Sequence, residues 1–246
     1  MGNLRAETLG GFLFLRQTLN MQITYYGHSC FEIHYGNHRI LFDPFISPNP
    51  KAAEIKLSNI QPTLIAISHA HGDHIDDAES IAKSSMAPIL ANYEITSWFA
   101  KQGIESSIGM NTGGTYRLDE LSICLTHAEH SSSFPDGSYG GTPNGFAVQL
   151  GPKSFYYAGD TDIFGDMQLI GSYFKPEFAF LPVGDCFTMG YERAAEAAIL
   201  LNVEKVIGMH FDTFPPIEIN HEKAIEYFTK KGIQLILPAI GQTLVF

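Results

Sequence analysis

The stretch Ile67-Ser68-His69-Ala70-His71-Gly72-Asp73-His74 holds four side chains that can bind a metal ion within six positions. The apolar residues 63–67 predict a buried strand before these side chains, and residues 75–84 predict a helix after them. We therefore expect the four side chains on a tight loop between a strand and a helix, where a rigid sheet can hold them.

The spacing within this loop indicates two metal ions. Side chains two residues apart point the same way in an extended segment, so His69 and His71 can present their imidazoles to one ion. Gly72 allows a sharp change of direction, after which Asp73 and His74 can bind a second ion nearby. A His-x-His pair alone often arises by chance, but the full stretch after an apolar strand is far more specific, provided that further ligands follow downstream.

Residues suited to complete such a site follow later predicted strands, which we expect at 121–126, 154–158 and 205–209. The candidates are His127 or His130 after the first strand, Asp160 after the second, and His210 after the third. Two neighbouring positive ions need an anionic group between them, and the carboxylate of Asp160 can supply it. The alternative is that Asp160 caps the next helix. Chemistry alone does not choose between His127 and His130.

Two residues near the N-terminus each have two interpretations. Asp43 ends the predicted strand 38–42 and is either a simple turn residue or a carboxylate that accepts a hydrogen bond from a ligand imidazole. His28 stands in a loop between two predicted strands and either faces the site or lies at the surface.

Residues 69–74 resemble the signature of the metallo-β-lactamase superfamily. The segments 130–146 and 182–190 are similar to those of uncharacterised metal-dependent hydrolases related to L-ascorbate-6-phosphate lactonase, and this similarity favours His130 over His127. The resemblance extends over residues 21–246. It implies an α/β fold, a four-layer αββα sandwich, with the metal site at one edge of the sheets.

The resemblance also implies a ligand set and an activity. It assigns one ion to His69, His71 and His130, the other to Asp73, His74 and His210, and the bridging position to Asp160. The implied enzyme is a metal-dependent hydrolase in which a metal-bridging hydroxide attacks an ester, lactone or phosphodiester and Asp73 carries the proton. Nitrogen and oxygen donors suit two divalent ions, with zinc as the first choice and manganese or iron as alternatives.

Two other activities are compatible with the same fold. One is a single-iron oxygenase; di-iron proteins of the superfamily usually carry Glu where His71 stands, which disfavours a di-iron oxidoreductase. The other is a nuclease, but a net charge of −11 disfavours a nucleic-acid partner. We therefore expect a small-molecule substrate, although no motif indicates which one.

The composition of the 246 residues, 45% apolar and 17% charged, fits one globular domain. We expect residues 1–20 to be an N-terminal extension and residues 21–246 to form a single hydrolase domain. The three cysteines, Cys30, Cys124 and Cys186, are odd in number and widely spaced, which indicates reduced thiols in a cytoplasmic protein. The apolar run at 10–15 is too short to span a membrane, and the sequence is compatible with a homo-oligomer.

Overall fold

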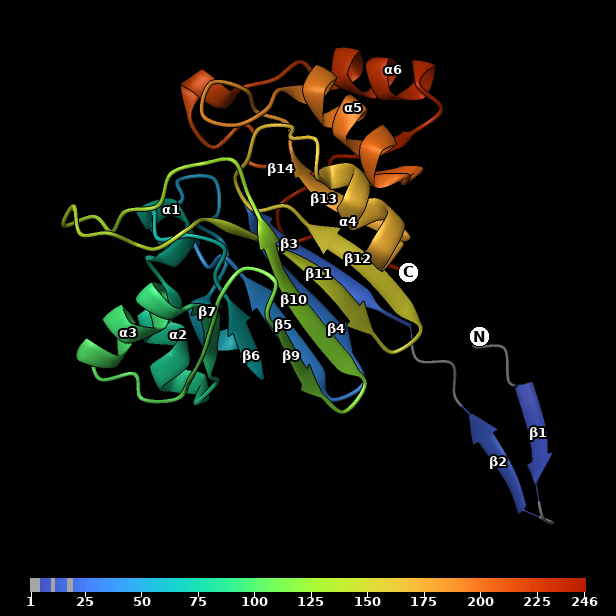
Figure 1. The fold of residues 1–246 in the computed structure, drawn as a ribbon, viewed down its shortest axis with the longest axis horizontal. Helices are drawn as coiled ribbons and strands as arrows, with labels where there is room; N and C mark the ends of the chain where they lie inside the picture. Colours follow the sequence, from blue (N-terminus) through green and yellow to red (C-terminus); the bar gives the residue numbers. More distant parts are fainter. Residues whose placement is uncertain (1–4, 10–11, 17–19) are drawn as a thin grey trace.

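Two mixed sheets of seven strands each dominate the computed structural model, which describes residues 5–9, 12–16 and 20–246 (Figure 1). The first sheet has the spatial order β16 (Thr243–Val245), β3 (Gln22–Gly27), β4 (Cys30–Tyr35), β5 (His38–Phe42), β6 (Leu64–Ala66), β7 (Ile89–Asn92) and β8 (Ser107–Met110). The second has the order β15 (Gln234–Ile236), β14 (Lys205–Met209), β13 (Phe178–Pro182), β12 (Lys153–Tyr157), β11 (Asn144–Leu150), β10 (Leu121–His127) and β9 (Thr115–Leu118).

The two sheets have the same internal plan. In the first, the strands from β16 to β5 pair antiparallel and those from β5 to β8 pair parallel. In the second, the strands from β9 to β12 pair antiparallel and those from β12 to β15 pair parallel. Parallel strands need crossover connections, which the helices provide.

Aromatic side chains from both sheets fill the space between them. Phe42 of β5 and Phe146 of β11 lie 5.6 Å apart between ring centroids, and Phe31 of β4 and Phe180 of β13 lie 4.8 Å apart. Successive side chains of a strand point to opposite faces. Phe42 accordingly enters this core, whereas its neighbour Leu41 packs into a second core on the outer face of the first sheet.

Helices cover the outer face of each sheet (Figure 1). The helices beside the first sheet are α1 (Gly72–Ile75), α2 (Ala78–Ser85) and α3 (Tyr93–Lys101). Those beside the second are α4 (Met167–Phe174), α5 (Tyr191–Leu201) and α6 (His221–Lys230). Short 3₁₀ turns lie at η1 (Leu57–Asn59) and η2 (Pro215–Ile217). The expected four-layer αββα sandwich is confirmed.

The loop that carries the clustered metal-binding residues differs in detail from expectation. The predicted helix 75–84 is two helices, because the carboxylate of Asp77 lies between them and accepts hydrogen bonds from the backbone N–H groups of Ile46 and Ser47 at 2.6 and 2.8 Å. Gly72 is the first residue of α1, so the chain changes direction there as expected, although the φ of Gly72 is not positive. His71 is extended and is the N-cap residue of this helix.

The N-terminal segment forms a small sheet of its own. Strands β1 (Arg5–Leu9) and β2 (Phe12–Arg16) pair antiparallel with each other and with no other described strand. The predicted extension, residues 1–20, includes residues 1–4, 10–11 and 17–19, which lie outside the described residues. None of the helices within the described ranges has the length and apolar character needed to cross a membrane.

Candidate metal centre

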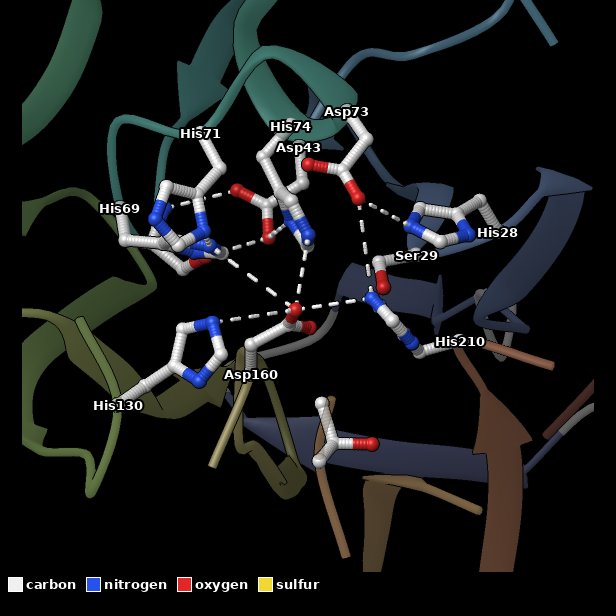
Figure 2. A network of polar contacts seen from close by, with 12 residues as sticks. His28, Ser29, Asp43, His69, His71, Asp73, His74, His130, Asp160 and His210 are labelled. Carbon is white, nitrogen blue, oxygen red and sulfur yellow. Dashed lines mark hydrogen bonds and ion pairs between the residues drawn. The ribbon is translucent and has the colours of Figure 1, made fainter. Parts of the chain in front are cut away.

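The candidate site is assembled from loops that follow the strands of both sheets. In sheets with parallel strands, ligands bind beyond the carboxyl ends of those strands. His69 follows β6, and Asp73 and His74 lie in α1. From the second sheet, His130 follows β10, Asp160 follows β12, and His210 follows β14. Figure 2 shows these side chains pointing toward one another.

A first group of imidazoles consists of His69, His71 and His130. One ring nitrogen of each lies within 4.8 Å of those of the other two. Nε2 of His69 is 3.0 Å from Nδ1 of His71. This closeness is what their spacing predicted, because side chains two positions apart on an extended segment point the same way. His130 is the third imidazole that the resemblance implied.

A second group contains Asp73, His74 and His210, and it also includes His28, with ligand atoms within the same 4.8 Å. His28 was open to two interpretations in the sequence, and the structure buries it within the site. Its Nε2 lies 3.1 Å from Oδ2 of Asp73, and burial lowers its pKa to about 4, assisted by His210. The imidazole of His28 is therefore neutral at physiological pH.

Asp160 lies between the two groups. Its Oδ2 is 2.9 Å from Nε2 of His210 and 3.3 Å from Nε2 of His74, which belong to the second group. The same oxygen is 3.7 Å from His130 and 3.9 Å from His69, which belong to the first (Figure 2). The helix-capping alternative is wrong, because α4 begins only at Met167 with Asp166 as its N-cap residue.

The backbone before Asp160 requires glycine. Gly159 has a φ of +62°, and a Cβ at this position would lie 2.7 Å from the carbonyl oxygen of Asn144 and 2.9 Å from Cβ of Ser68. Glycine adopts this conformation without steric cost and permits the close approach of β12 to the loop after β6.

Asp43 is fully buried directly behind His74. Its Oδ2 lies 2.9 Å from Nδ1 of His74 and accepts hydrogen bonds from the hydroxyls of Ser68 at 2.6 Å and Tyr157 at 2.8 Å. Its Oδ1 accepts from the backbone N–H of Ser68 at 2.7 Å. Asp43 therefore orients His74 and leaves Nε2 of that ring directed at the site. Of the two interpretations of Asp43, the structure supports the carboxylate that holds a ligand imidazole rather than the simple turn residue.

The electrostatics of the cluster suit a cation. Burial holds the pKa of His69 well below its ordinary value, and burial also lowers the pKa of His71 and His130, so these rings keep lone pairs for a metal. Although burial raises the pKa of Asp160, His210 and His74 hold it well below its usual range, so the carboxylate stays charged.

Unpaired atoms mark the same place. Nε2 of His74 and Oδ1 of Asp160 are buried without a hydrogen-bond partner among the described residues. Burial lowers the pKa of His74, but the carboxylates of Asp160 and Asp43 outweigh this effect and raise it well above its ordinary value. The two carboxylates therefore favour a positive charge at the His74 ring that lies between them, and a divalent cation bound at Nε2 would supply that charge. The donor set fits such ions.

His127 does not join either group. It ends β10 with its side chain 45% exposed, and its Nε2 pairs with a carboxylate oxygen of Glu129 at 2.8 Å. Of the two histidines left open by chemistry, the structure brings only His130 to the cluster. Thr213, whose hydroxyl lies 2.9 Å from Nδ1 of His28, is a further residue at the site that no sequence pattern indicated.

Comparison with known proteins gives a consistent result. The family model of the beta-lactamase superfamily domain matches residues 22–210. A UPF0173 metal-dependent hydrolase of Methylacidiphilum infernorum is 49% identical over 226 residues, which are 92% of this chain and 100% of that protein. One from Thermus thermophilus is 42% identical over 87% of this chain and 94% of its own.

A solved structure shows the same architecture. Igni18, described as a novel metallo hydrolase from Ignicoccus hospitalis, superposes with a TM-score of 0.84 at 36% identity, covering 92% of this chain and 98% of its own. The chain therefore belongs to the metallo-β-lactamase superfamily and is a metal-dependent hydrolase.

Proposed function

We propose that this hydrolase holds two divalent ions and cleaves an ester, lactone or phosphodiester bond in a small-molecule substrate. The observation that carries the proposal is the position of Asp160, whose Oδ2 lies 2.9–3.9 Å from imidazoles of both groups. A carboxylate in this position offsets the repulsion between two cations.

The proposed ligands divide as the two groups do. One ion is held by His69, His71 and His130, the other by Asp73, His74 and His210, and Asp160 is shared between them. Once bound, such a pair of ions polarises the scissile group and lowers the pKa of a water molecule toward neutrality. Zinc is our first choice and manganese or iron the alternatives, because the donors are nitrogen and carboxylate oxygen. None of the three cysteines belongs to the ligand groups found among the described residues.

Asp73 is the proposed proton carrier. Its side chain is 30% exposed, so water and a leaving group can reach it, whereas Asp160 is 3% exposed. Burial raises the pKa of Asp73, but the hydrogen bond with His28 and the nearby imidazoles hold it well below its usual range. The carboxylate is therefore charged, and its exposure, rather than its lowered pKa, supports a role in accepting a proton from the attacking water and passing it to the leaving group.

The proposal extends to the cellular context. The three cysteines are free thiols, which supports a reducing compartment and hence the cytoplasm. The net charge of −11 supports a small molecule over a nucleic acid as substrate.

Elemental analysis of the purified protein, combined with hydrolysis assays on aryl phosphodiesters and lactones, tests the proposal. We expect about two divalent ions per chain and turnover of one substrate class that stops when a chelator is added. One iron per chain with oxygen uptake and no hydrolysis would replace the proposal by the single-iron oxygenase. Failure to bind any metal after reconstitution would refute the ligand set.

A further inference from the structure

His28 has an unusual backbone conformation that several contacts hold in place. Its φ is 56°, in the left-handed region, which is sterically unfavourable for a residue with a side chain. The carbonyl oxygen of His28 accepts hydrogen bonds from the backbone N–H of His210 at 2.9 Å and from the hydroxyl of Tyr25 at 3.1 Å. The fold thus maintains a strained residue beside the metal centre, a pattern that occurs at functional sites.

Both ring nitrogens of His28 already have partners. Nε2 lies 3.1 Å from Oδ2 of Asp73, and Nδ1 lies 2.9 Å from the hydroxyl of Thr213. An ionised carboxylate can only accept a hydrogen bond, so the nitrogen facing Asp73 must carry the hydrogen. A nitrogen that carries a hydrogen has no lone pair in the ring plane to offer a metal ion. Nδ1 then has to accept a hydrogen bond from the Thr213 hydroxyl at 2.9 Å, so that hydroxyl donates to Nδ1 rather than to the carbonyl oxygen of Phe211, which lies farther away at 3.4 Å.

The ring is also enclosed on its sides. It packs at 4.1 Å between centroids against His210, and edge-on against Phe45 at 5.5 Å and Phe214 at 5.7 Å. These neighbours oppose a rotation that would turn Nε2 away from Asp73. Among residues 20–246, the hydrogen bonds to the Asp73 carboxylate reach Oδ2 only, so Oδ1 is left without a protein partner.

We propose that His28 is a positioning residue that fixes the Asp73 carboxylate through an Nε2–H donor and is not itself a metal ligand. This role rests on the proposed function, in which Asp73 binds an ion and carries the proton. By holding Oδ2, His28 determines which oxygen of Asp73 faces the reacting groups, and Thr213 determines the orientation of His28.

The first test is the position of the hydrogen on His28 in the metal-free protein. Long-range ¹H–¹⁵N correlation spectra of ¹⁵N-histidine-labelled protein distinguish protonated from unprotonated ring nitrogens, and the His28→Gln variant assigns the signal. We expect a hydrogen on Nε2 of His28. A ring with the hydrogen on Nδ1 and an unprotonated Nε2 would overturn the proposal. This readout does not depend on any turnover.

The second test uses Co²⁺ as a spectroscopic substitute for the native ions. Two variants are matched: His28→Asn tolerates the left-handed backbone but is too short to reach Asp73, whereas His28→Gln can present an amide N–H where Nε2 stood. A positioning role predicts that both variants bind as much Co²⁺ as the wild type, and that His28→Gln has an unchanged visible absorption spectrum. Loss of one equivalent of Co²⁺, with a changed spectrum in both variants, would show that His28 is a ligand.

Activity provides the third comparison, on the substrate class that the wild type hydrolyses. Loss of a partner that orients a metal ligand typically costs about 10–100-fold. We expect His28→Asn to lose kcat by about this factor with KM nearly unchanged, and His28→Gln to recover most of it. Equal kcat in the wild type and His28→Asn would contradict the role. If the wild type itself lacks two ions or hydrolysis, the proposed function fails, while the ¹⁵N measurement still decides the state of His28.

Discussion

Asp73 is the residue whose replacement separates metal binding from proton transfer. Asp73→Asn keeps an oxygen donor and the side-chain volume but cannot accept a proton. General acid–base catalysis contributes typically about 10²–10⁴-fold. We therefore expect kcat to fall by about this factor while elemental analysis still finds both ions. Full turnover with both ions bound would exclude Asp73 as the proton carrier.

Asp43 tests whether a residue outside the ligand set controls metal affinity. Asp43→Asn removes the negative charge behind His74 and places an amide N–H against the donors of Ser68 or Tyr157. We expect metal affinity to fall about 10–100-fold, measured by competition with a chelator of known affinity.

Tyr157→Phe is the matched control for that change. It removes one of the hydrogen bonds to Asp43 while the carboxylate keeps its charge and its contact with His74. We expect a metal affinity close to that of the wild type. An equal loss of affinity in both variants would mean that packing between the sheets, rather than the charge of Asp43, determines the effect.

Single residues also show how far the sequence could be interpreted. His69, His71, Asp73 and His74 stood out because they are adjacent in the chain, and the structure brings them to one place. His28 and Thr213 could not be assigned in this way, because they lie 185 positions apart and meet only through the pairing of loops from different sheets. Their separation in the sequence, rather than their residue types, prevented the contact between them from being predicted.

Helix α3 lies between β7 and β8, and its N-cap residue is linked by hydrogen bonds to the metal-binding loop. Asn92 precedes it, and its Oδ1 accepts a hydrogen bond from the backbone N–H of Ile95 at 2.9 Å. Its Nδ2 donates to the carbonyl oxygens of Gly140 at 2.9 Å and Thr142 at 3.0 Å. Ser132 donates to the same carbonyl of Gly140 and accepts from the N–H of Ala70. A helix cap thus reaches the segment between His69 and His71.

Replacing this cap should cost more than an ordinary cap. Asn220 caps α6 with the same contact at 2.9 Å to Lys223 but is exposed and makes no further side-chain hydrogen bonds among the described residues. We expect Asn220→Ala to lower the free energy of unfolding by about 1 kcal/mol. Asn92→Ala should lower it by about 2–4 kcal/mol, because one buried and one partly buried hydrogen bond are lost as well. Urea unfolding measures both, and equal losses would show that the contacts to Gly140 and Thr142 contribute nothing.

At the level of elements, the strands were predicted well and their connections less so. Strands β5 and β14 have the predicted bounds. The edge strand β8 was not predicted, because its short, half-buried sequence contains Gly109 and lacks a clear alternation. The division between α1 and α2 depends on hydrogen bonds that Asp77 makes with residues 46 and 47, and no local pattern carries that information.

Metal binding should stabilise the whole molecule, because the site joins both sheets. A ligand present at a thousand times its dissociation constant stabilises the native state by about 4 kcal/mol. For a chain of this size, that corresponds to roughly 8–16 °C in Tm. We expect chelation to lower Tm by about this amount in differential scanning calorimetry.

Two histidine variants make this measurement specific. His127→Asn should keep the full difference in Tm between the metal-bound and metal-free protein, because His127 lies outside both groups. His130→Asn should lose part of it, because an imidazole of the first group is missing. The same difference in both variants would remove His130 from the ligand set.

We propose that residues 1–20 are an N-terminal extension outside the hydrolase domain, and a relative supports this. The protein of Methylacidiphilum infernorum aligns over its full length with 226 of the 246 residues. Deletion of residues 1–20 should therefore leave kcat, KM and Tm unchanged within error. A loss of either activity or thermal stability would assign these residues to the hydrolase domain.

The proposed ligand set is divided between the two halves of the sandwich. The loop after β6 contributes His69 to His74, whereas His130, Asp160 and His210 all come from the second sheet. Neither half carries enough donors for both ions. If the chain were cut between β8 and β9 and expressed as two fragments, bound ions would hold the two fragments together. A split version of this protein would then report a divalent metal by its own reassembly.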